Sequence, residues 1–316
     1  MKTSRRDFVI NATLLATGAA FSCKATAIAD VNKKKSFSNL PDAEQGKICV
    51  FSKHFPELGY EELASVVAAM GFDGIDLTVR PEGHVLPENV ERDLPLAVEA
   101  AKKFGLKIYM IATAIVDVDD KYTEPILQTA SSLGIRHYRM GYMNYSEEKS
   151  IPQNLVAIKA KFEKLSKINR KYQIRGEYQN HYGDAFGAAV WDLWEVLKHI
   201  DPEWTGVQYD VFHATVEGAH SWPLGFNLLR PYIGTMDIKD YYWEKNDKKW
   251  QPNSVPLGEG MVDYKKFMAL LKENKMGGPF SIHCEYLPEA DDLRSKSEKI
   301  KQDLITLRKW LKEAGL

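Results

Sequence analysis

The sequence lacks most features that mark a specialised class of protein. Its 316 residues hold three cysteines, Cys23, Cys49 and Cys284, too few and too far apart for a disulfide framework or a zinc knuckle. Lysine and arginine total 42 against 43 for aspartate and glutamate, so no global basic field could hold a phosphate backbone, and a nucleic-acid partner is not expected. A membrane-spanning helix needs about 20 continuous apolar residues, and only the N-terminus comes near that. The chain must therefore be stabilised by its own core.

Residues 1–30 have the pattern of a twin-arginine export signal. Arg5 and Arg6 precede a weakly apolar run from Val9 to Phe21. We therefore expect a periplasmic protein, with lipid anchoring through Cys23 as an alternative and no transmembrane helix in the mature chain. A polar linker is predicted at 31–46 and one folded domain at 47–316.

The domain alternates short β-branched runs with longer segments of helical periodicity. Strands are predicted at 48–52, 74–78, 107–111, 137–140, 174–178, 207–210, 234–238 and 280–285. Helices are predicted at 60–70, 90–104, 123–133, 155–172, 186–199, 224–229, 264–273 and 295–311. Gly71, Gly105 and Gly134 stand where helix C-caps are expected. Eight such units predict a single α/β domain, a (β/α)8 TIM barrel, whereas an open doubly wound sheet would need a glycine-rich turn after the first strand.

Acidic residues gather at the ends of four consecutive predicted strands. Glu177, Asp210, Asp237 and Glu285 occupy these positions, and the carboxyl ends of barrel strands meet at one face. Converging carboxylates repel one another unless a cation joins them or some are protonated. The pattern therefore predicts a divalent ion bound by these four residues, with oxygen ligands favouring magnesium, manganese or calcium over zinc.

Several fragments together resemble one known family, the sugar phosphate isomerases and epimerases of the xylose isomerase-like TIM barrels. The fragments run Asp76 to Val85, Glu177, Asp210 with His213, Ile238-Lys239-Asp240, Pro256 to Asp263, and Glu285-Tyr286. The resemblance covers nearly the whole mature chain. It implies a metal held at Glu177, Asp210, Asp237 and Glu285, with the two glutamates also shuttling protons.

The strand-seven position departs from the family pattern, which has histidine where this chain has Asp237. The extra carboxylate adds negative charge to a site that is already anionic. Three outcomes stay open. The site binds a hard ion with Lys239 compensating, it recruits His181 or His283 as a nitrogen ligand, or it has lost the metal.

The expected chemistry is isomerisation or epimerisation of a sugar or keto-sugar through a metal-stabilised enediolate. Glu177 and Glu285 would move the proton, and Lys239 and His213 are the other candidate catalytic residues. The same enolate could expel a leaving group, so a lyase or hydratase acting on periplasmic 3-keto-glycosides is an alternative. A non-catalytic carbohydrate-binding relative is another. Because phosphorylated sugars are mainly cytoplasmic, we expect an unphosphorylated sugar or glycoside.

Four further residues are candidates for substrate binding: His84, Arg80, His181 and Trp222. Each also has a structural interpretation. His84 could hydrogen-bond only to backbone, Arg80 could pin its own loop, and Trp222 could pack on a helix. A homo-oligomer is compatible with the sequence.

Overall fold

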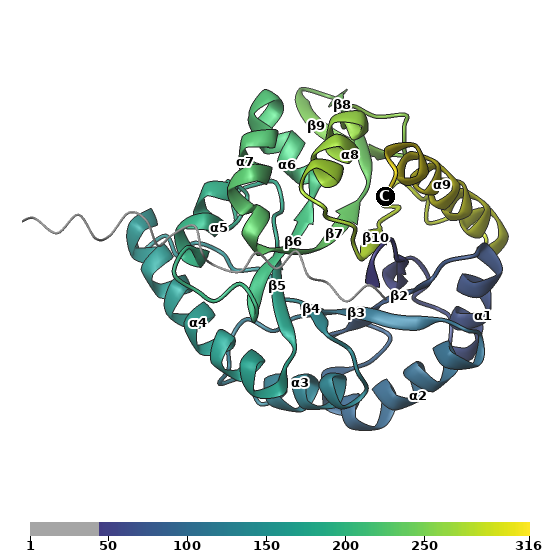
Figure 1. The fold of residues 1–316 in the computed structure, drawn as a ribbon, viewed down its shortest axis with the longest axis horizontal. Coiled ribbons are helices and arrows are strands. Elements are labelled where there is room, and N and C mark those ends of the chain that lie inside the picture. The colour runs from purple at the N-terminus through teal and green to yellow at the C-terminus, as the bar shows by residue number, and fades with distance from the viewer. Residues whose placement is uncertain (1–43) are drawn as a thin grey trace, which may run out of the picture. The chain divides into compact units, whose positions relative to one another are not determined.

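The computed structural model describes residues 44–316, and the fold is drawn in Figure 1. The predicted export signal, Cys23 and most of the predicted linker lie outside the described residues. Among residues 44–316, no helix has both the length and the apolar character needed to cross a membrane.

Eight parallel strands close into a barrel, as predicted. Their order around the barrel is β1-β10-β7-β6-β5-β4-β3-β2. Their bounds are β1 Ile48–Phe51, β2 Gly74–Val79, β3 Lys107–Thr113, β4 His137–Arg139, β5 Arg175–Gln179, β6 Thr205–Asp210, β7 Ile233–Ile238 and β10 Phe280–Ile282. Parallel pairing places all carboxyl ends at one rim, which we call the mouth.

Helices surround the barrel on the outside (Figure 1). They are α1 Tyr60–Met70, α2 Val90–Lys103, α3 Thr123–Ser132, α4 Ile151–Tyr172, α5 Val190–Leu197, α6 Val211–Gly218, α7 Trp222–Leu229, α8 Tyr264–Glu273 and α9 Leu293–Ala314. The predicted glycine caps adopt positive φ at Gly71 (94°), Gly105 (74°) and Gly134 (79°), so each helix turns back toward its strand as the sequence indicates.

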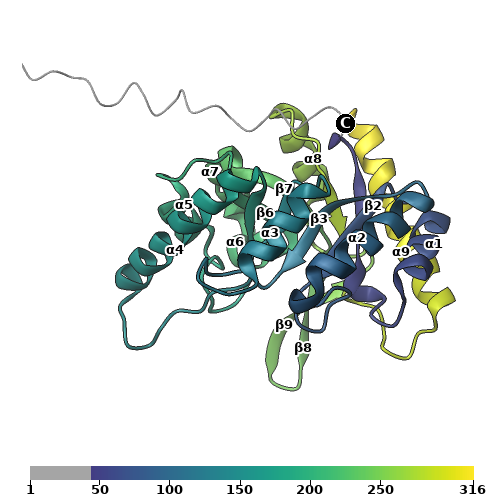
Figure 2. The same cartoon turned by 90° about the horizontal axis from the view of Figure 1, so that it is seen from below.

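Two strands and one helix were not predicted. Strands β8 (Asp240–Asn246) and β9 (Lys249–Val255) form an antiparallel hairpin, which projects from the barrel in Figure 2. Helix α6 begins immediately after β6, because the carboxylate of Asp210 accepts a hydrogen bond from the backbone N–H of His213 and caps the helix. Strand β10 ends at Ile282, so Glu285 lies beyond it rather than on it.

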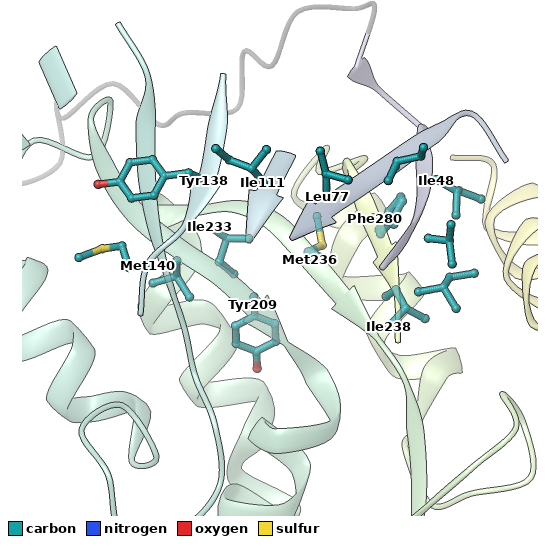
Figure 3. Packing of buried hydrophobic residues seen from close by; sticks show 14 of the residues in the cluster. Ile48, Leu77, Ile111, Tyr138, Met140, Tyr209, Ile233, Met236, Ile238 and Phe280 are labelled. Carbon is teal, nitrogen blue, oxygen red and sulfur yellow. The ribbon is translucent and has the colours of Figure 1, made fainter. Parts of the chain in front are cut away.

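The strands have two chemically different faces. Outward-facing side chains such as Tyr138, Met236 and Ile238 are apolar and belong to the main hydrophobic core (Figure 3). Helices cover this core, in which Cys284 is buried as a free thiol, and Cys49 is likewise buried and free. The inward faces carry most of the polar residues, and the chemistry of the barrel lies there.

Candidate active site

Polar and charged side chains fill much of the barrel interior. Residues that alternate inward along or directly after the strands are Asp76, His137, Arg139, Arg175, Glu177, Gln179, Gln208, Asp210, Thr235, Asp237, Lys239, Ser281 and His283, and all are at most 6% exposed. Barrels of this architecture usually fill that space with branched apolar side chains. Buried charges are costly unless paired, so the way these groups pair decides what the site can do.

Glu177 lies toward the amino ends of the strands. Its register partner is Gly206, the second residue of β6. Its Oε1 lies 2.8 Å from Nδ1 of His137, and its Oε2 accepts a hydrogen bond from the hydroxyl of Thr235. Gly234 leaves the space that this carboxylate occupies, since a Cβ at position 234 would lie 1.9 Å from Oε1 of Glu177. The structure thus places Glu177 in an internal network and does not bring it together with the other three predicted ligands.

Asp237 occupies the middle of the interior. Its Oδ1 accepts a hydrogen bond of 2.6 Å from the amide of Gln208 and lies 3.2 Å from Nε2 of His283, while its Oδ2 accepts from the amide of Gln179. Burial alone would lower the pKa of His283, but Asp237 outweighs burial and raises that pKa to about 9. At neutral pH, therefore, an imidazolium already supplies positive charge to Asp237.

Asp76 completes a buried group with Asp237 and His283. One donor atom from each lies within 4.8 Å of the others, a spacing that could hold a metal ion. Ser281 donates a 2.9 Å hydrogen bond to Oδ2 of Asp76, and Nε2 of His283 lies 3.8 Å from the same oxygen. Because the pKa of His283 is about 9, an ion here would have to displace its proton.

Lys239 lies where two of the predicted ligands converge at the mouth. Its Nζ is 3.1 Å from Oδ2 of Asp210, 3.3 Å from Oε2 of Glu285 and 2.8 Å from Nε2 of His213. Burial opposes its charged form, but Asp210 and Glu285 outweigh burial and raise the pKa of Lys239. The three protons of the ammonium group thus match three partners, and the charge is held in place by geometry.

The two carboxylates beside Lys239 differ in environment. Asp210 is buried, and burial raises its pKa to about 6 although Lys239 opposes the rise. The side chain of Glu285 is 35% exposed. Burial would raise the pKa of Glu285, but Lys239 and then His283 outweigh it and lower that pKa to about 2. Glu285 is therefore the ionised carboxylate that faces the mouth.

Gln179 stands on β5 at the position opposite Asp210 and Asp237. Its amide nitrogen donates to Oδ2 of both, at 2.9 Å for Asp210. Its carbonyl oxygen accepts from Nη1 of Arg139 at 2.9 Å and from the hydroxyl of Tyr142. An amide thus separates two carboxylates where a glutamate would have added a third.

His213 and His181 form one wall beside Lys239. Their ring centroids lie 3.9 Å apart. Nε2 of His213 accepts from Lys239, which puts the ring proton on Nδ1, a buried atom with no hydrogen-bond partner in residues 44–316. Nδ1 of His181 donates to the carbonyl of Tyr182 at 2.8 Å, so its Nε2 carries a free lone pair. Burial lowers the pKa of both rings, and each is neutral.

The other predicted substrate residues fall in different places. Both ring nitrogens of His84 are occupied, one by the hydroxyl of Thr78 at 3.1 Å and one by the carbonyl of Phe55 at 3.0 Å, so this side chain ties its loop to the barrel. Trp222 is buried at the start of α7, with its ring 6.3 Å from that of Phe267. It packs in the helical layer and does not join the mouth. Arg80 does lie at the mouth, directly after β2.

Three residues of the site were not predicted: Arg139, Gln179 and Tyr142. Arg139 follows from strand parity, since it is the second inward position of a strand that begins with His137. Gln179 faces the same side of β5 as Glu177. Which of the two belongs to the site depends on how far along the barrel axis each residue lies. Tyr142 carries no sequence signal, because its position depends on the path of the loop after β4.

The four carboxylates expected to bind a divalent ion do not form one ligand set. Glu177 is engaged by His137 and Thr235, and both oxygens of Asp237 accept hydrogen bonds. The remaining pair, Asp210 and Glu285, already has a cation between its members, the ammonium group of Lys239. A second positive charge at that point would be repelled. These residues therefore do not fit the implied ion.

Comparison with known proteins finds solved structures that share this barrel fold. No curated protein matches the chain. Among solved structures, a probable 3-DHS dehydratase from Bacillus anthracis is 15% identical, with a TM-score of 0.64 over 83% of this chain and 98% of that one. A 3-keto-D-glucoside 4-epimerase from E. coli is 14% identical, with a TM-score of 0.64 over 83% and 99%. A xylose isomerase-like TIM barrel protein from Mycobacterium smegmatis, solved with magnesium, is 19% identical, with a TM-score of 0.61 over 84% and 97%.

These structures share the fold of this chain, and at such low sequence identity they do not indicate its function. The sequence pattern of one family, however, matches residues 64–313, which is most of the chain. The residues it covers include every barrel strand except β1 and nearly all of the helical layer. The chain therefore belongs to the xylose isomerase-like TIM barrel family.

Proposed function

We propose that the protein is a carbohydrate enzyme that removes a proton from the carbon beside a carbonyl group, and that it acts as an isomerase or epimerase. The observation that carries this proposal is the ammonium group of Lys239, held between Asp210 and Glu285 at the mouth. Membership of the family, whose solved neighbours include sugar epimerases and a dehydratase, supports the same chemistry.

Lys239 is suited to stabilise an enediolate. When a C–H bond beside a carbonyl breaks, its electron pair forms a C=C bond and negative charge moves to the carbonyl oxygen. A fixed ammonium group in a buried site stabilises that charge without reorganisation at the moment of reaction. All three protons of Lys239 are already used, so the substrate oxygen would have to replace a partner. The 3.3 Å contact with the exposed Glu285 is the weakest of the three.

Glu285 is the proposed base. In the free protein, Lys239 holds the pKa of Glu285 at about 2, which makes it a weak proton acceptor. A substrate oxygen that takes over the hydrogen bond from Lys239 weakens this ion pair, and the pKa of Glu285 then rises toward the range where proton transfer is efficient. Binding of substrate would thus activate the base.

His181 is the proposed second acid–base residue. It would return or remove a proton on the side of the substrate opposite Glu285. It follows β5, whereas Glu285 follows β10, and β6 and β7 separate them in the barrel. Its ring is neutral, and its Nε2 lone pair is free. Glu285 and His181 therefore flank Lys239 from two sides, which is the arrangement that inversion at one carbon requires.

Elimination is the second candidate. Glu177 is internal, and Glu285 is the one predicted carboxylate that is substantially exposed. A single exposed base suits a lyase acting on a 3-keto-glycoside, since it takes the proton and can then protonate the leaving oxygen on the same side. The loss of all chemistry, with retention of sugar binding, is the remaining alternative.

Solvent exchange separates these functions. Ketoses and 3-keto-glycosides would be incubated in D2O with the protein, and NMR would record deuterium at carbon together with the products. An epimer or isomer supports the first proposal, and a released aglycone with an unsaturated sugar supports the second. Glu285→Gln should lower exchange by about a thousandfold, whereas Glu289→Gln, on the exposed segment nearby, should not change it. Exchange that survives Glu285→Gln would contradict the proposed base.

A further inference from the structure

Two arginines at the mouth form no ion pair with a carboxylate of the described residues, 44–316. Arg80 is half-buried after β2, and its side chain makes no hydrogen bond or ion pair with any residue between 44 and 316. Its guanidinium carbon lies 5.8 Å from the centre of the Phe51 ring. The guanidinium carbon of Arg139, at the end of β4, lies 5.2 Å from the same ring centre. Two guanidinium groups therefore share one aromatic platform.

Arg139 is the more constrained of the two. It is 6% exposed, and its Nη1 donates to Gln179 at 2.9 Å. Its Nε is buried and has no hydrogen-bond partner in the described residues. Buried donors of this kind are rare, since leaving one without a hydrogen bond is energetically costly.

The proximity of the two cations is itself unfavourable. Burial, and next the charge of Arg139, lower the pKa of Arg80, although a guanidinium group stays charged at any physiological pH. By contrast, Lys239 and His283 each lie within ion-pair distance of a carboxylate, Glu285 and Asp237 respectively. The two guanidinium groups that form no ion pair within residues 44–316 thus lie on the β2 and β4 side of the mouth.

We propose that Arg80 and Arg139 bind an anionic oxygen group of the substrate, so that the preferred substrate is a sugar acid or a phosphorylated sugar rather than a neutral sugar. A carboxylate and a phosphoryl group each present a pair of oxygen atoms that can accept two parallel hydrogen bonds from a guanidinium group. The ring of Phe51 makes a cation–π contact with each of the two arginines. This inference concerns the same site as the proposed function and rests on it.

The test is calorimetric binding with three matched probes. D-Gluconate carries a carboxylate, D-glucose 6-phosphate carries a phosphoryl group, and D-sorbitol is a neutral polyol of the same carbon number. We expect at least one of the anions to bind at least tenfold more tightly than sorbitol. The stronger of the two identifies the anionic group. Equal binding of all three probes would overturn the proposal.

Arg80→Gln should remove the preference, because it deletes the guanidinium group and keeps a polar, uncharged side chain. Arg80→Lys, which keeps the charge but loses the fork, should retain part of it. Arg92→Gln is the control, since Arg92 is 69% exposed on α2 and paired with Asp93. An anion preference that persists in Arg80→Gln would also overturn the proposal. A protein that prefers anions but exchanges no deuterium would sink the proposed function alone.

Discussion

The ammonium nitrogen of Lys239 lies 3.1 Å from Oδ2 of Asp210 inside the mouth of the barrel. This contact places a protein cation at the point where a bound metal ion was expected from the sequence. A lysine differs from a metal ion in one useful respect, because it donates hydrogen bonds in fixed directions as well as carrying charge. The contact also explains how Asp210 can be buried at the end of β6 without a metal.

Replacing Lys239 by methionine should abolish most catalysis. The variant keeps the length of the side chain but removes the charge that stabilises the enediolate, and we expect a loss of about a thousandfold in the rate of deuterium exchange. Loss of the cation also leaves Asp210 without its partner, so the variant should be less stable in urea. Lys245→Met, on the exposed hairpin, is the matched control. Retention of more than half the activity by Lys239→Met would rule out the proposed role.

Glu177 and Glu285 should respond to substitution in opposite ways. Glu177→Gln removes one of the two carboxylate partners of buried His137, the other being Glu44, and should cost about 3 kcal/mol of unfolding free energy. The rate should fall only in proportion to the loss of folded protein. Glu285→Gln should lower the rate with little change in stability, because Glu285 is substantially exposed. Urea unfolding and exchange rates on the same samples separate the two. A folded Glu177→Gln variant with no activity would instead place Glu177 in catalysis.

Much of the fold could be predicted because local chemistry determines it. Gly71 and Gly134 adopt the positive φ expected of helix caps, and helices α1 and α8 span the predicted residues. The hairpin could not be predicted, since Tyr242 and Trp243 in an aromatic run are equally compatible with a loop packed on a helix. Its strands depend on pairing with each other, which sequence periodicity does not determine.

The site was harder to predict than the fold. Strand parity indicates that Glu177, Asp237 and Lys239 face inward, and all three side chains are buried in the barrel. Parity does not give the depth along the barrel, which depends on the stagger between neighbouring strands. Glu177 pairs with the second residue of β6, whereas Asp210 is the last, and this offset separates two groups that the sequence pattern places together.

His283 should make stability fall as the pH rises above neutrality. Its pKa is raised from an ordinary 6.5 to about 9 in the folded state, so the folded protein holds a proton that the unfolded chain releases. The corresponding stabilisation is on the order of 3 kcal/mol, is fully present below pH 6.5, and is lost as the pH passes through about 9. Unfolding in urea measured between pH 6 and 10 should show this loss.

His283→Gln cannot take up the proton and should flatten that pH dependence, whereas His220→Gln, on the exposed segment before α7, should preserve it. The imidazole can also be followed directly by NMR in the wild-type protein, which avoids any dependence on how well the variant folds. An imidazole that titrates near its ordinary pKa would show that Asp237 does not hold the charged form.

Gln179→Glu should create a divalent-ion site with Asp210 and Asp237, two of the four ligands predicted from the sequence. The amide of Gln179 donates to both Asp210 and Asp237, so a glutamate would instead present oxygen atoms to two carboxylates. Without metal, repulsion among the three should lower stability. Manganese or magnesium at about 100 times its dissociation constant should then stabilise the variant by about 2.7 kcal/mol, as measured by thermal unfolding. Gln251→Glu, on the exposed hairpin, should gain nothing. If the wild-type protein binds the ion as tightly as Gln179→Glu does, Lys239 does not replace the metal, and our assignment of this site is wrong.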